Sequence, residues 1–491
     1  MASLEDLTKI LKEKGFKKNE IDTIKRAHFF TDTAHKNQVR KSGEPYITHP
    51  TQTAINLVNM NLDTPTITAG LLHDVPEDTT YTLVDIEKEF GSEVAKLVTG
   101  VTNLGKIKYR GIERFAENLR KMFISMAQDV RVILIKMADR LHNMQTLYYL
   151  PKEKQKRISM EVLEIYAPIA HRLGMGQIKG QLEDLAFPYA YPEEFKKFQS
   201  QVISNYKDRV KYINELIEKV RDELLKEKIK IYTIHGRTKH LYSLYRKLMR
   251  PQYNNDISRI YDLVAVRIVV PTVEDCYKVL GIIHQMWKPL PGRIKDYIAQ
   301  PKPNSYQSLH STIFGPKKTM VEFQIRTQEM HQQAEFGIAA HWRYKQMGKG
   351  YMSRLKGYHH KGYKTPKKLD WINELASWQS EIGDNEEFLK ELKIDVFQDR
   401  LLVFTPNGDV IDLPEHATPI DFAYYIHSDI GNHCVGAKIN EKIEKLDTPL
   451  RSGDVVEILT DRSRKGPSRD WLSIAKTSSA KSKIRNYFSK G

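Results

Sequence analysis

Apolar residues recur at helical spacing through the first 200 residues of this 491-residue chain. The clearest examples are "EVAKLVTGV" (93–101), "RVILIKMADRLHNM" (131–144) and "EVLEIYAPIAHRL" (161–173), and few stretches alternate as strands do. This periodicity predicts an all-α domain over residues 1–200.

The pattern changes after residue 200. A long charged helix is expected over 206–228, followed by the β-branched runs "KIYTIHG" (230–236), "DLVAVRIVV" (262–270) and "TMVEFQIRT" (319–327), with helical segments between them. Strands that alternate with helices predict a mixed α/β domain over 201–345.

The remaining chain is expected to form three parts. Residues 346–392 are rich in Lys, Gly and Tyr without periodicity, which indicates a basic linker or helical connector. Short alternating strands with an Asn407-Gly408 turn predict a small β-rich module over 393–461, and a basic tail, 462–491, follows it. The chain is therefore multidomain, as its length also implies.

Composition narrows the class of protein. No apolar stretch reaches the roughly 20 residues needed to cross a bilayer, and the charged start lacks a signal-peptide core. Cys276 and Cys434 are far apart, without the spacing of a zinc or redox site. We therefore expect a cytoplasmic protein with no membrane association.

The net charge of +16 suits a protein that handles polyanions. Nucleotides, RNA and an anionic membrane all fit that description, and so does a merely solvated basic surface. Charge alone does not choose between these alternatives.

Four side chains from three separate helical segments form a candidate metal site. They are His49 in "YITHP", His73 and Asp74 in "LLHDVPEDT", and Asp139 in "IKMADRLHNM". Two nitrogen and two carboxylate ligands suit Mn²⁺, Fe²⁺ or Zn²⁺, and such an ion polarises phosphoryl oxygens and lowers the pKa of bound water. Each residue alone is weak support, since a lone His-Asp pair occurs by chance and a lone Asp beside Arg140 is more often half of an ion pair.

The order of these motifs resembles the HD-superfamily phosphohydrolases. "LLHDVPEDT", "VTNLGKIKY" and "MADRLHNMQTL" resemble the hydrolase domain of the RelA/SpoT family. The resemblance implies Mn²⁺-dependent hydrolysis of the 3′-pyrophosphate of (p)ppGpp. It assigns the metal ligands His49, His73, Asp74 and Asp139, the catalytic acids Glu77 and Asp78, and the substrate-binding residues Arg40, Lys41, Asn143 and Thr146.

Pro76 departs from the family pattern, which usually has an aliphatic residue there. Because proline resists a helix interior, we expect the chain to leave the helix just before Glu77. The position of the acidic pair Glu77 and Asp78 would then differ from that in other members.

A second group of residues begins at "IHGRTKHLYSLYRKLM". Arg237, Lys239, Ser243 and Lys247 would gather cations and a hydroxyl near a helix start, which makes a plausible triphosphate site, although no P-loop motif occurs.

Two acids in otherwise apolar strands extend this group. Asp262 and Glu322 favour Mg²⁺ binding and base chemistry, although an ion pair with Arg267 is the structural alternative. In the Pro-rich stretch that follows residue 290, Tyr306 beside Asn304 suits stacking on a purine and bonding to its edge.

Together these segments resemble the synthetase domain of the same family, which transfers the β,γ-pyrophosphate of ATP to the ribose 3′-hydroxyl of GDP or GTP. The run Arg293-Ile294-Lys295-Asp296 matches bifunctional members, and Thr238 stands where a proline is usual. The resemblance implies that Asp262 holds Mg²⁺ and that Glu322 activates the hydroxyl. ATP would bind Arg237, Lys239, Ser243, Lys247 and Arg267, and the guanine nucleotide would bind Lys295, Lys302, Asn304, Tyr306 and His310.

Residues 393–461 resemble a TGS domain, a β-grasp-like module, through "VFTPNGDVIDLP" and "LRSGDVVEILT". In long family members this module contacts uncharged tRNA on the ribosome, which implies His427 as the contact here, with His433 as the lesser candidate. Long members continue into regulatory domains, so the resemblance indicates a shortened chain.

The overall fold prediction is an all-α HD-type hydrolase domain, a mixed α/β nucleotidyltransferase-like synthetase domain and a TGS domain. Two other hypotheses stay open: a tRNA- and ribosome-binding factor with degenerate catalysis, and a chain that is only a hydrolase. If both activities are present, movement of helices around residues 150–205 is expected to make them mutually exclusive. The sequence favours no oligomeric state.

Overall fold

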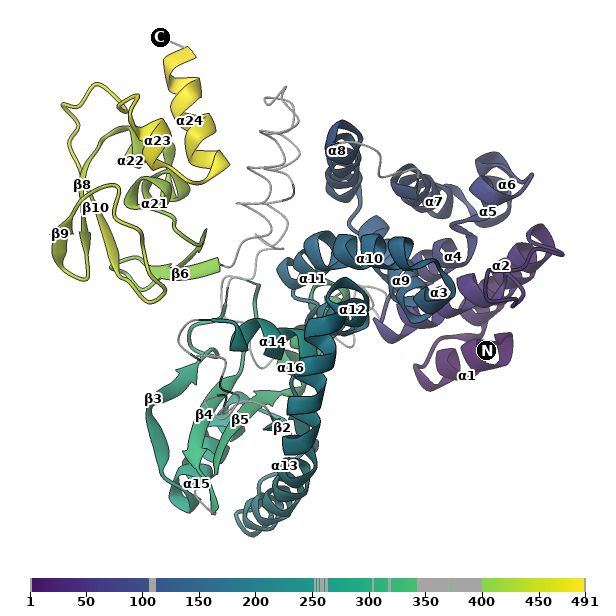
Figure 1. Cartoon of the computed structure of the whole chain (residues 1–491), viewed down its shortest axis with the longest axis horizontal. Coiled ribbons are helices and arrows are strands. Elements are labelled where there is room, and N and C mark those ends of the chain that lie inside the picture. Colours follow the sequence, from purple (N-terminus) through teal and green to yellow (C-terminus); the bar gives the residue numbers. More distant parts are fainter. Residues whose placement is uncertain are drawn as a thin grey trace. The chain divides into compact units, whose positions relative to one another are not determined.

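The structure is a computed structural model, and it describes residues 2–105, 112–250, 253, 256, 260, 264–302, 304–316, 319–341, 372 and 400–489. The chain forms two compact units, one of Met1–Thr102 with Leu134–Tyr358, the other of Asn103–Ile133 with His359–Gly491 (Figure 1). No described helix is both long enough and apolar enough to cross a membrane.

The described part of the first 200 residues is helical, which confirms the predicted all-α domain, and it contains no β-strand beyond an isolated bridge between Val39 and Pro45. Asp63 shows how the sequence starts one of these helices, because its side chain accepts from the Thr66 amide at 3.2 Å and Pro65 follows in the first turn. The helices are α1 (Leu4–Glu13), α2 (Lys18–Ala34), α3 (Thr48–Asn59), α4 (Thr64–Leu72), α5 (Val75–Asp78), α6 (Leu83–Phe90), α7 (Ser92–Gly105), α8 (Ile112–Gln128), α9 (Arg131–Gln145), α10 (Lys152–Glu161), α11 (Ala167–Arg172), α12 (Gly176–Ala190) and α13 (Pro192–Lys226).

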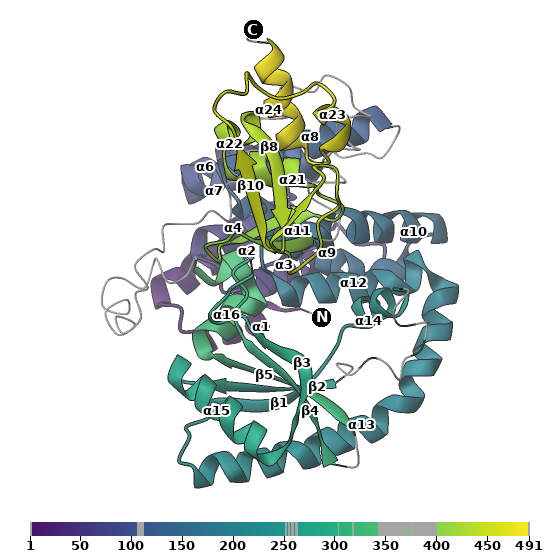
Figure 2. The same ribbon diagram turned by 90° about the vertical axis from the view of Figure 1, so that its left-hand side faces the viewer.

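A five-stranded mixed sheet follows α13 and confirms the predicted α/β domain. Its strands are β1 (Thr233–Thr238), β2 (Val264–Val270), β3 (Pro289–Asp296), β4 (Leu309–Phe314) and β5 (Met320–Thr327), in the order β1-β2-β5-β4-β3. Only β2 and β5 pair in parallel. The helices α14 (Leu241–Leu248), α15 (Val273–Met286) and α16 (Gln328–Phe336) connect or follow the strands, as Figure 2 shows.

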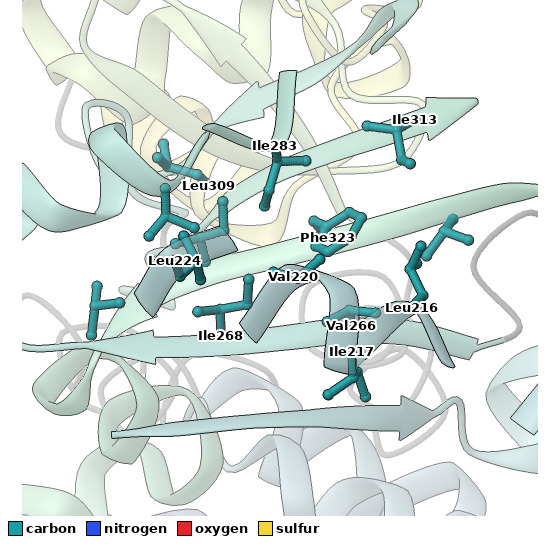
Figure 3. Packing of buried hydrophobic residues seen from close by; sticks show 14 of the residues in the cluster. Leu216, Ile217, Val220, Leu224, Val266, Ile268, Ile283, Leu309, Ile313 and Phe323 are labelled. Atoms are coloured by element: carbon teal, nitrogen blue, oxygen red, sulfur yellow. The ribbon is translucent and has the colours of Figure 1, made fainter. Parts of the chain in front are cut away.

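One face of this sheet is apolar. Leu216, Val220 and Leu224 from α13 and Ile283 from α15 pack against Val266, Ile268, Leu309, Ile313 and Phe323 of the strands (Figure 3). Because side chains alternate along a strand, the residues between these point to the other face of the sheet. That second face is polar, and it holds several of the predicted synthetase residues.

The second unit contains the predicted small β-rich module. The hairpin of β6 (Arg400–Phe404) and β7 (Val410–Pro414) turns at Gly408, whose φ is +85°, as the Asn-Gly signal predicts. A second sheet has the order β10-β8-β9. The other elements are α21 (Pro419–Ile426), α22 (Ser428–Asn432), β8 (Cys434–Ile439), β9 (Lys442–Glu444) and β10 (Val456–Thr460).

The segment predicted as a basic tail contains two helices, α23 (Trp471–Ile474) and α24 (Ser478–Ser489). Ala480 and Ile484 of α24 share a buried cluster with Ile420 and Tyr424 of α21. The described part of this segment therefore packs as part of the module. The predicted linker, 346–392, lies outside the described residues except for Ile372.

Candidate active sites

The four predicted metal ligands converge in the helical domain. His49 extends from α3 and Asp139 from α9, while His73 and Asp74 follow α4. Nε2 of His49 lies 3.5 Å from Oδ2 of Asp74 and 3.3 Å from Oδ1 of Asp139, and Nε2 of His73 lies 3.2 Å from Oδ1 of Asp74. His49, His73 and Asp74 each offer one ligand atom within 4.8 Å of the others, so these three side chains could hold a metal ion.

The His73-Asp74 pair occupies a break between two helices. α4 ends at Leu72, α5 begins at Val75, and Pro76 lies in the first turn of α5, where the missing N–H is not needed. The backbone amides of Glu77 and Asp78 both donate to the Asp74 carbonyl, at 3.1 and 3.0 Å. The prediction that the chain leaves the helix just before Glu77 is therefore wrong, because the break comes earlier and α5 includes the acidic pair.

The hydrogen bonds of His73 orient its ring for a cation. Its Nδ1–H donates to the Gly70 carbonyl at 2.8 Å, so in the neutral ring Nε2 carries a lone pair. That atom is buried, faces Asp74, and has no hydrogen-bond partner among the described residues. A lone pair facing a carboxylate is unfavourable unless a cation lies between them, so these donors fit a divalent metal ion.

His142 orients the second imidazole, and the sequence analysis did not identify it. Its Nδ1 lies 3.3 Å from Nη1 of Arg40, which can only donate, and 2.7 Å from Nδ1 of His49. Nδ1 of His142 is therefore an acceptor and Nδ1–H of His49 is a donor, which leaves Nε2 of His49 for the ligand set. Burial, with His49 and Arg40 nearby, lowers the pKa of His142 to about 3 and keeps it neutral.

Lys136 and Tyr46 were also missed. Nζ of Lys136 lies 2.9 Å from Oδ2 of Asp139, and although burial opposes ionisation, Lys136 holds the pKa of Asp139 well below its usual range. The Tyr46 hydroxyl lies 2.9 Å from Oδ2 of both Asp74 and Asp78. Lys136 lies in "IKMADRLHNM", the motif of Asp139, and Tyr46 lies in "YITHP", the motif of His49. Their positions in these motifs are the sequence signal that could have identified them.

The acidic pair lies beside the ligand set. Burial raises the pKa of Glu77 above its ordinary value, so this carboxylate binds a proton more readily than an exposed one. Asp78 is held through its backbone, because Nε2 of Gln38 donates to its carbonyl at 2.9 Å.

The predicted substrate-binding residues of this site are only partly gathered. Nη2 of Arg40 donates to Oδ1 of Asn143 at 2.9 Å, and Nδ2 of Asn143 donates to Asp139, so both residues adjoin the metal ligands. The Thr146 hydroxyl lies one turn further on and faces the His142 carbonyl at 3.3 Å. Lys41 is exposed in the loop before α3.

The predicted synthetase residues share the polar face of the mixed sheet. In register, Arg237 pairs with Ala265, Ala265 with Glu322, and Lys295 with His310. Arg267 and His310 both pair with Gln324, which lies two residues beyond Glu322 on β5. Side chains in register lie on one face, so the sheet brings together Arg237, Arg267, Lys295, His310 and Glu322.

A hydrogen-bonded chain crosses this face. Nδ1 of His310 lies 2.6 Å from Oε1 of Glu322, and Nε2 of His310 lies 2.8 Å from the Tyr306 hydroxyl. Oδ1 of Asn304 accepts from the Tyr306 amide at 3.2 Å, which shapes the turn before β4.

Tyr297, which the sequence analysis did not select, adjoins three of these residues. Nζ of Lys302 lies 4.7 Å from the centre of the Tyr297 ring and 5.4 Å from that of Tyr306. The Tyr297 ring also meets His310 edge-on at 5.3 Å. Burial, with Lys295 nearby, lowers the pKa of Lys302.

Side chains of α12 form hydrogen bonds with residues in α14 and just before it. The Ser243 hydroxyl donates to Oε2 of Glu183 at 2.8 Å, and Oδ2 of Asp184 lies 2.7 Å from Nδ1 of His240. Lys247, one turn after Ser243, has its Nζ 5.4 Å from the centre of the Tyr253 ring. Lys239 lies two residues before the start of α14, and Asp262 lies outside the described residues.

In the β-rich module, His427 and His433 flank α22. Nδ1 of the exposed His427 accepts from the Asp429 amide at 3.1 Å, which caps the helix. Nδ1 of His433 lies 2.9 Å from the Asp429 carbonyl. Both side chains therefore have local structural roles.

Comparison with known families defines the class of protein. The HD domain model matches residues 27–176, the region found in RelA / SpoT proteins matches 236–349, and the TGS domain model matches 401–460. The chain thus combines an HD domain, a RelA/SpoT region and a TGS domain, as predicted.

Individual relatives match nearly the whole chain. It is 46% identical over 99% of its length to a guanosine-3′,5′-bis(diphosphate) 3′-pyrophosphohydrolase of Aquifex aeolicus, covering 67% of that protein. It is 49% identical over 95% of its length to a GTP pyrophosphokinase of Myxococcus xanthus, and 43% identical over 97% to a bifunctional (p)ppGpp synthase/hydrolase of Mycobacterium tuberculosis. It spans 60% and 63% of those two relatives. The chain belongs to the RelA/SpoT family.

Proposed function

We propose that this chain is a bifunctional alarmone enzyme of the stringent response. It transfers pyrophosphate from ATP to the 3′-hydroxyl of GDP or GTP, and it hydrolyses the 3′-pyrophosphate of (p)ppGpp back to GDP or GTP. The observation that carries the proposal is the presence on one chain of two separate polar sites, the His49–Asp139 ligand set with Glu77 and Asp78, and the Glu322–His310–Tyr306 chain. The names of the relatives include both activities.

In hydrolysis, His49, His73, Asp74 and Asp139 would hold a divalent ion, which we propose is Mn²⁺. When bound, that ion polarises phosphoryl oxygens and makes water more acidic. Glu77 takes a proton from the attacking water, and its raised pKa suits that exchange. Arg40, Lys41, Asn143 and Thr146 hold the nucleotide. The water oxygen bonds to the phosphorus attached to the ribose 3′-oxygen, the bond between that phosphorus and the 3′-oxygen breaks, and the proton taken from water passes to the 3′-oxygen, which releases GDP or GTP and pyrophosphate.

In synthesis, the 3′-hydroxyl of GDP or GTP attacks the β-phosphorus of ATP and AMP leaves. Glu322 accepts the hydroxyl proton, and His310 orients the carboxylate through Nδ1–H. ATP binds to Arg237, Lys239, Ser243, Lys247 and Arg267. The guanine nucleotide binds to Lys295, Lys302, Asn304, Tyr306 and His310. Positioning of the two substrates and neutralisation of their charge supply most of the catalysis.

Further proposals concern the remaining parts of the chain. Asp262 would hold Mg²⁺ for synthesis, and His427 with His433 would contact uncharged tRNA on the ribosome. We propose the domain limits 1–200, 201–345, 346–392, 393–461 and 462–491, and a cytoplasmic location, where the nucleotide substrates occur.

Nucleotide chromatography tests the function directly. Purified protein receives ppGpp with Mn²⁺ in one reaction and ATP with GDP and Mg²⁺ in another, with Asp74→Ala and Glu322→Ala variants alongside. We expect the first variant to lose only hydrolysis and the second only synthesis. A folded parent protein without either reaction contradicts the proposal, and retained tRNA binding without turnover would instead favour a binding factor.

A further inference from the structure

A buried charge cluster on the polar face of the sheet connects Arg267, which is assigned to ATP, with residues that have no assigned role. A single carboxylate oxygen, Oε1 of Glu335 on α16, lies 2.9 Å from Nη1 of Arg267 and 2.9 Å from Nη2 of Arg326. Nη2 of Arg326 also lies 2.7 Å from Nδ1 of His331, one turn before Glu335. Glu335 thus bridges arginines from two adjacent parallel strands, β2 and β5.

Both arginine side chains are buried, and that of Arg326 is buried completely. The Arg326 side chain is 0% exposed and that of Arg267 is 5% exposed. Among the described residues, Nε and Nη1 of Arg326 and Nε of Arg267 have no hydrogen-bond partner. The Arg326 side chain therefore has no exposed surface in this structure, and it contacts Glu335 and His331.

The charges of the cluster do not cancel. Burial beside Arg326 lowers the pKa of His331 to about 4, so His331 is neutral and accepts from Arg326. Although burial opposes ionisation, Arg267 and Arg326 hold the pKa of Glu335 below its usual range. Glu335 is then one negative charge between two buried cations, and without it the guanidinium groups would repel each other.

The backbone around Glu335 is held at both ends of α16. The Thr327 hydroxyl at the end of β5 accepts from the Met330 amide at 3.2 Å and starts the helix. After the helix, the Ile338 amide donates to the Leu173 carbonyl at 3.0 Å, and Gly337 has a φ of +56°. A Cβ at Gly337 would meet the Leu173 carbonyl oxygen at 2.1 Å, so the chain is closely fitted there. The helix that carries Glu335 is therefore held in place at both ends.

We propose that Glu335 is a positioning residue for ATP: it fixes the guanidinium of Arg267 on the polar face, and Arg326 with His331 fixes Glu335. This inference rests on the proposed function, in which Arg267 serves ATP and not the guanine nucleotide. It follows that loss of the Glu335 charge affects one substrate and leaves the other unaffected.

The test compares Glu335→Gln, which keeps the shape and removes the charge, with Glu329→Gln, which changes an exposed residue of the same helix. We expect Glu335→Gln to raise the KM for ATP about tenfold or more, with the KM for GDP changed by less than about twofold. Glu329→Gln should match the parent protein. An unchanged KM for ATP, or equal rises for both substrates, overturns the inference.

Two additions keep the test decisive. Because Glu335→Gln leaves buried cations unpaired, the unfolding midpoint of this variant is measured first. If the variant does not fold, the KM values for ATP and for GDP are measured with Glu335→Asp instead, which keeps the charge but has a shorter side chain. If the parent forms no alarmone, the proposed function fails, and titration with ATP alone decides the inference. Weaker ATP binding by the variant supports it, and equal binding contradicts it.

Discussion

Nδ1 of His310 lies 2.6 Å from Oε1 of Glu322, across the antiparallel strands β4 and β5. Burial lowers the pKa of His310 and keeps its ring neutral. A neutral ring has one N–H, and a carboxylate only accepts, so Nδ1–H donates to Glu322 and Nε2 accepts from the Tyr306 hydroxyl. The ring thus sets the orientation of the proposed base.

This arrangement predicts different effects for two amide substitutions of His310. The amide nitrogen of asparagine lies near the position of Nδ1, so His310→Asn keeps the donor to Glu322, whereas His310→Gln places its amide near Nε2. We expect His310→Gln to lower the kcat of synthesis by roughly 100-fold and His310→Asn to lower it much less. Initial rates of alarmone formation measure the difference. Equal losses would mean that the Glu322 contact does not govern the rate.

His142 provides a prediction for metal binding in the helical domain. The neutral His142 accepts from Nδ1–H of His49 at 2.7 Å, which fixes the tautomer of that ligand. His142→Phe removes the acceptor at similar size, and we expect it to weaken Mn²⁺ binding by about 10-fold to 100-fold. His142→Asn, which offers a carbonyl acceptor, should restore much of the affinity. Calorimetric titration with Mn²⁺ measures both, and equal affinities in the two variants would exclude this role.

The sequence predicted the residues whose chemistry is carried by a short motif. His73 and Asp74 are adjacent, and Glu77 and Asp78 follow within one turn, so a local pattern identifies them. The strand pattern likewise placed Arg267 and Glu322 in β-structure. Alternation along the strands then explains why both lie on the polar face.

Partners distant in the chain could not be found in this way. His142 contacts His49 over a separation of 93 residues, and Ser243 bonds to Glu183 over 60. Which ring nitrogen donates also depends on the tertiary contacts of the imidazole and on its burial, which no local pattern reports. The Pro76 prediction was wrong for a related reason, because the helix break falls at the His73-Asp74 pair, where the backbone positions the ligands.

Substitution of Gly180 tests whether the close packing of His240, at the start of α14, against α12 is needed for synthesis. A Cβ at Gly180 would lie 2.1 Å from ring atoms of His240, which Asp184 holds at 2.7 Å. We expect Gly180→Ala to displace the start of α14, with Ser243, and to lower the rate of synthesis up to about 100-fold. Gly281→Ala is the matched control, because its Cβ would meet nothing within 4 Å. If both variants keep the parent rate, the close fit is not needed for activity.

The cluster around Glu335 predicts a pH dependence of stability. The pKa of His331 is about 4 in the folded chain, because of burial beside Arg326, against an ordinary value of 6.5. The unfolded chain therefore binds more protons between these values, so the free energy of unfolding falls as the pH decreases through this window. His331→Asn removes the titrating group but keeps an acceptor for Arg326, and we expect the unfolding midpoint to depend less steeply on pH. The exposed His416→Asn is the control and should follow the parent protein. Identical pH profiles for the parent protein and both variants would show that folding does not lower the pKa of His331, which contradicts its role as a neutral acceptor for Arg326.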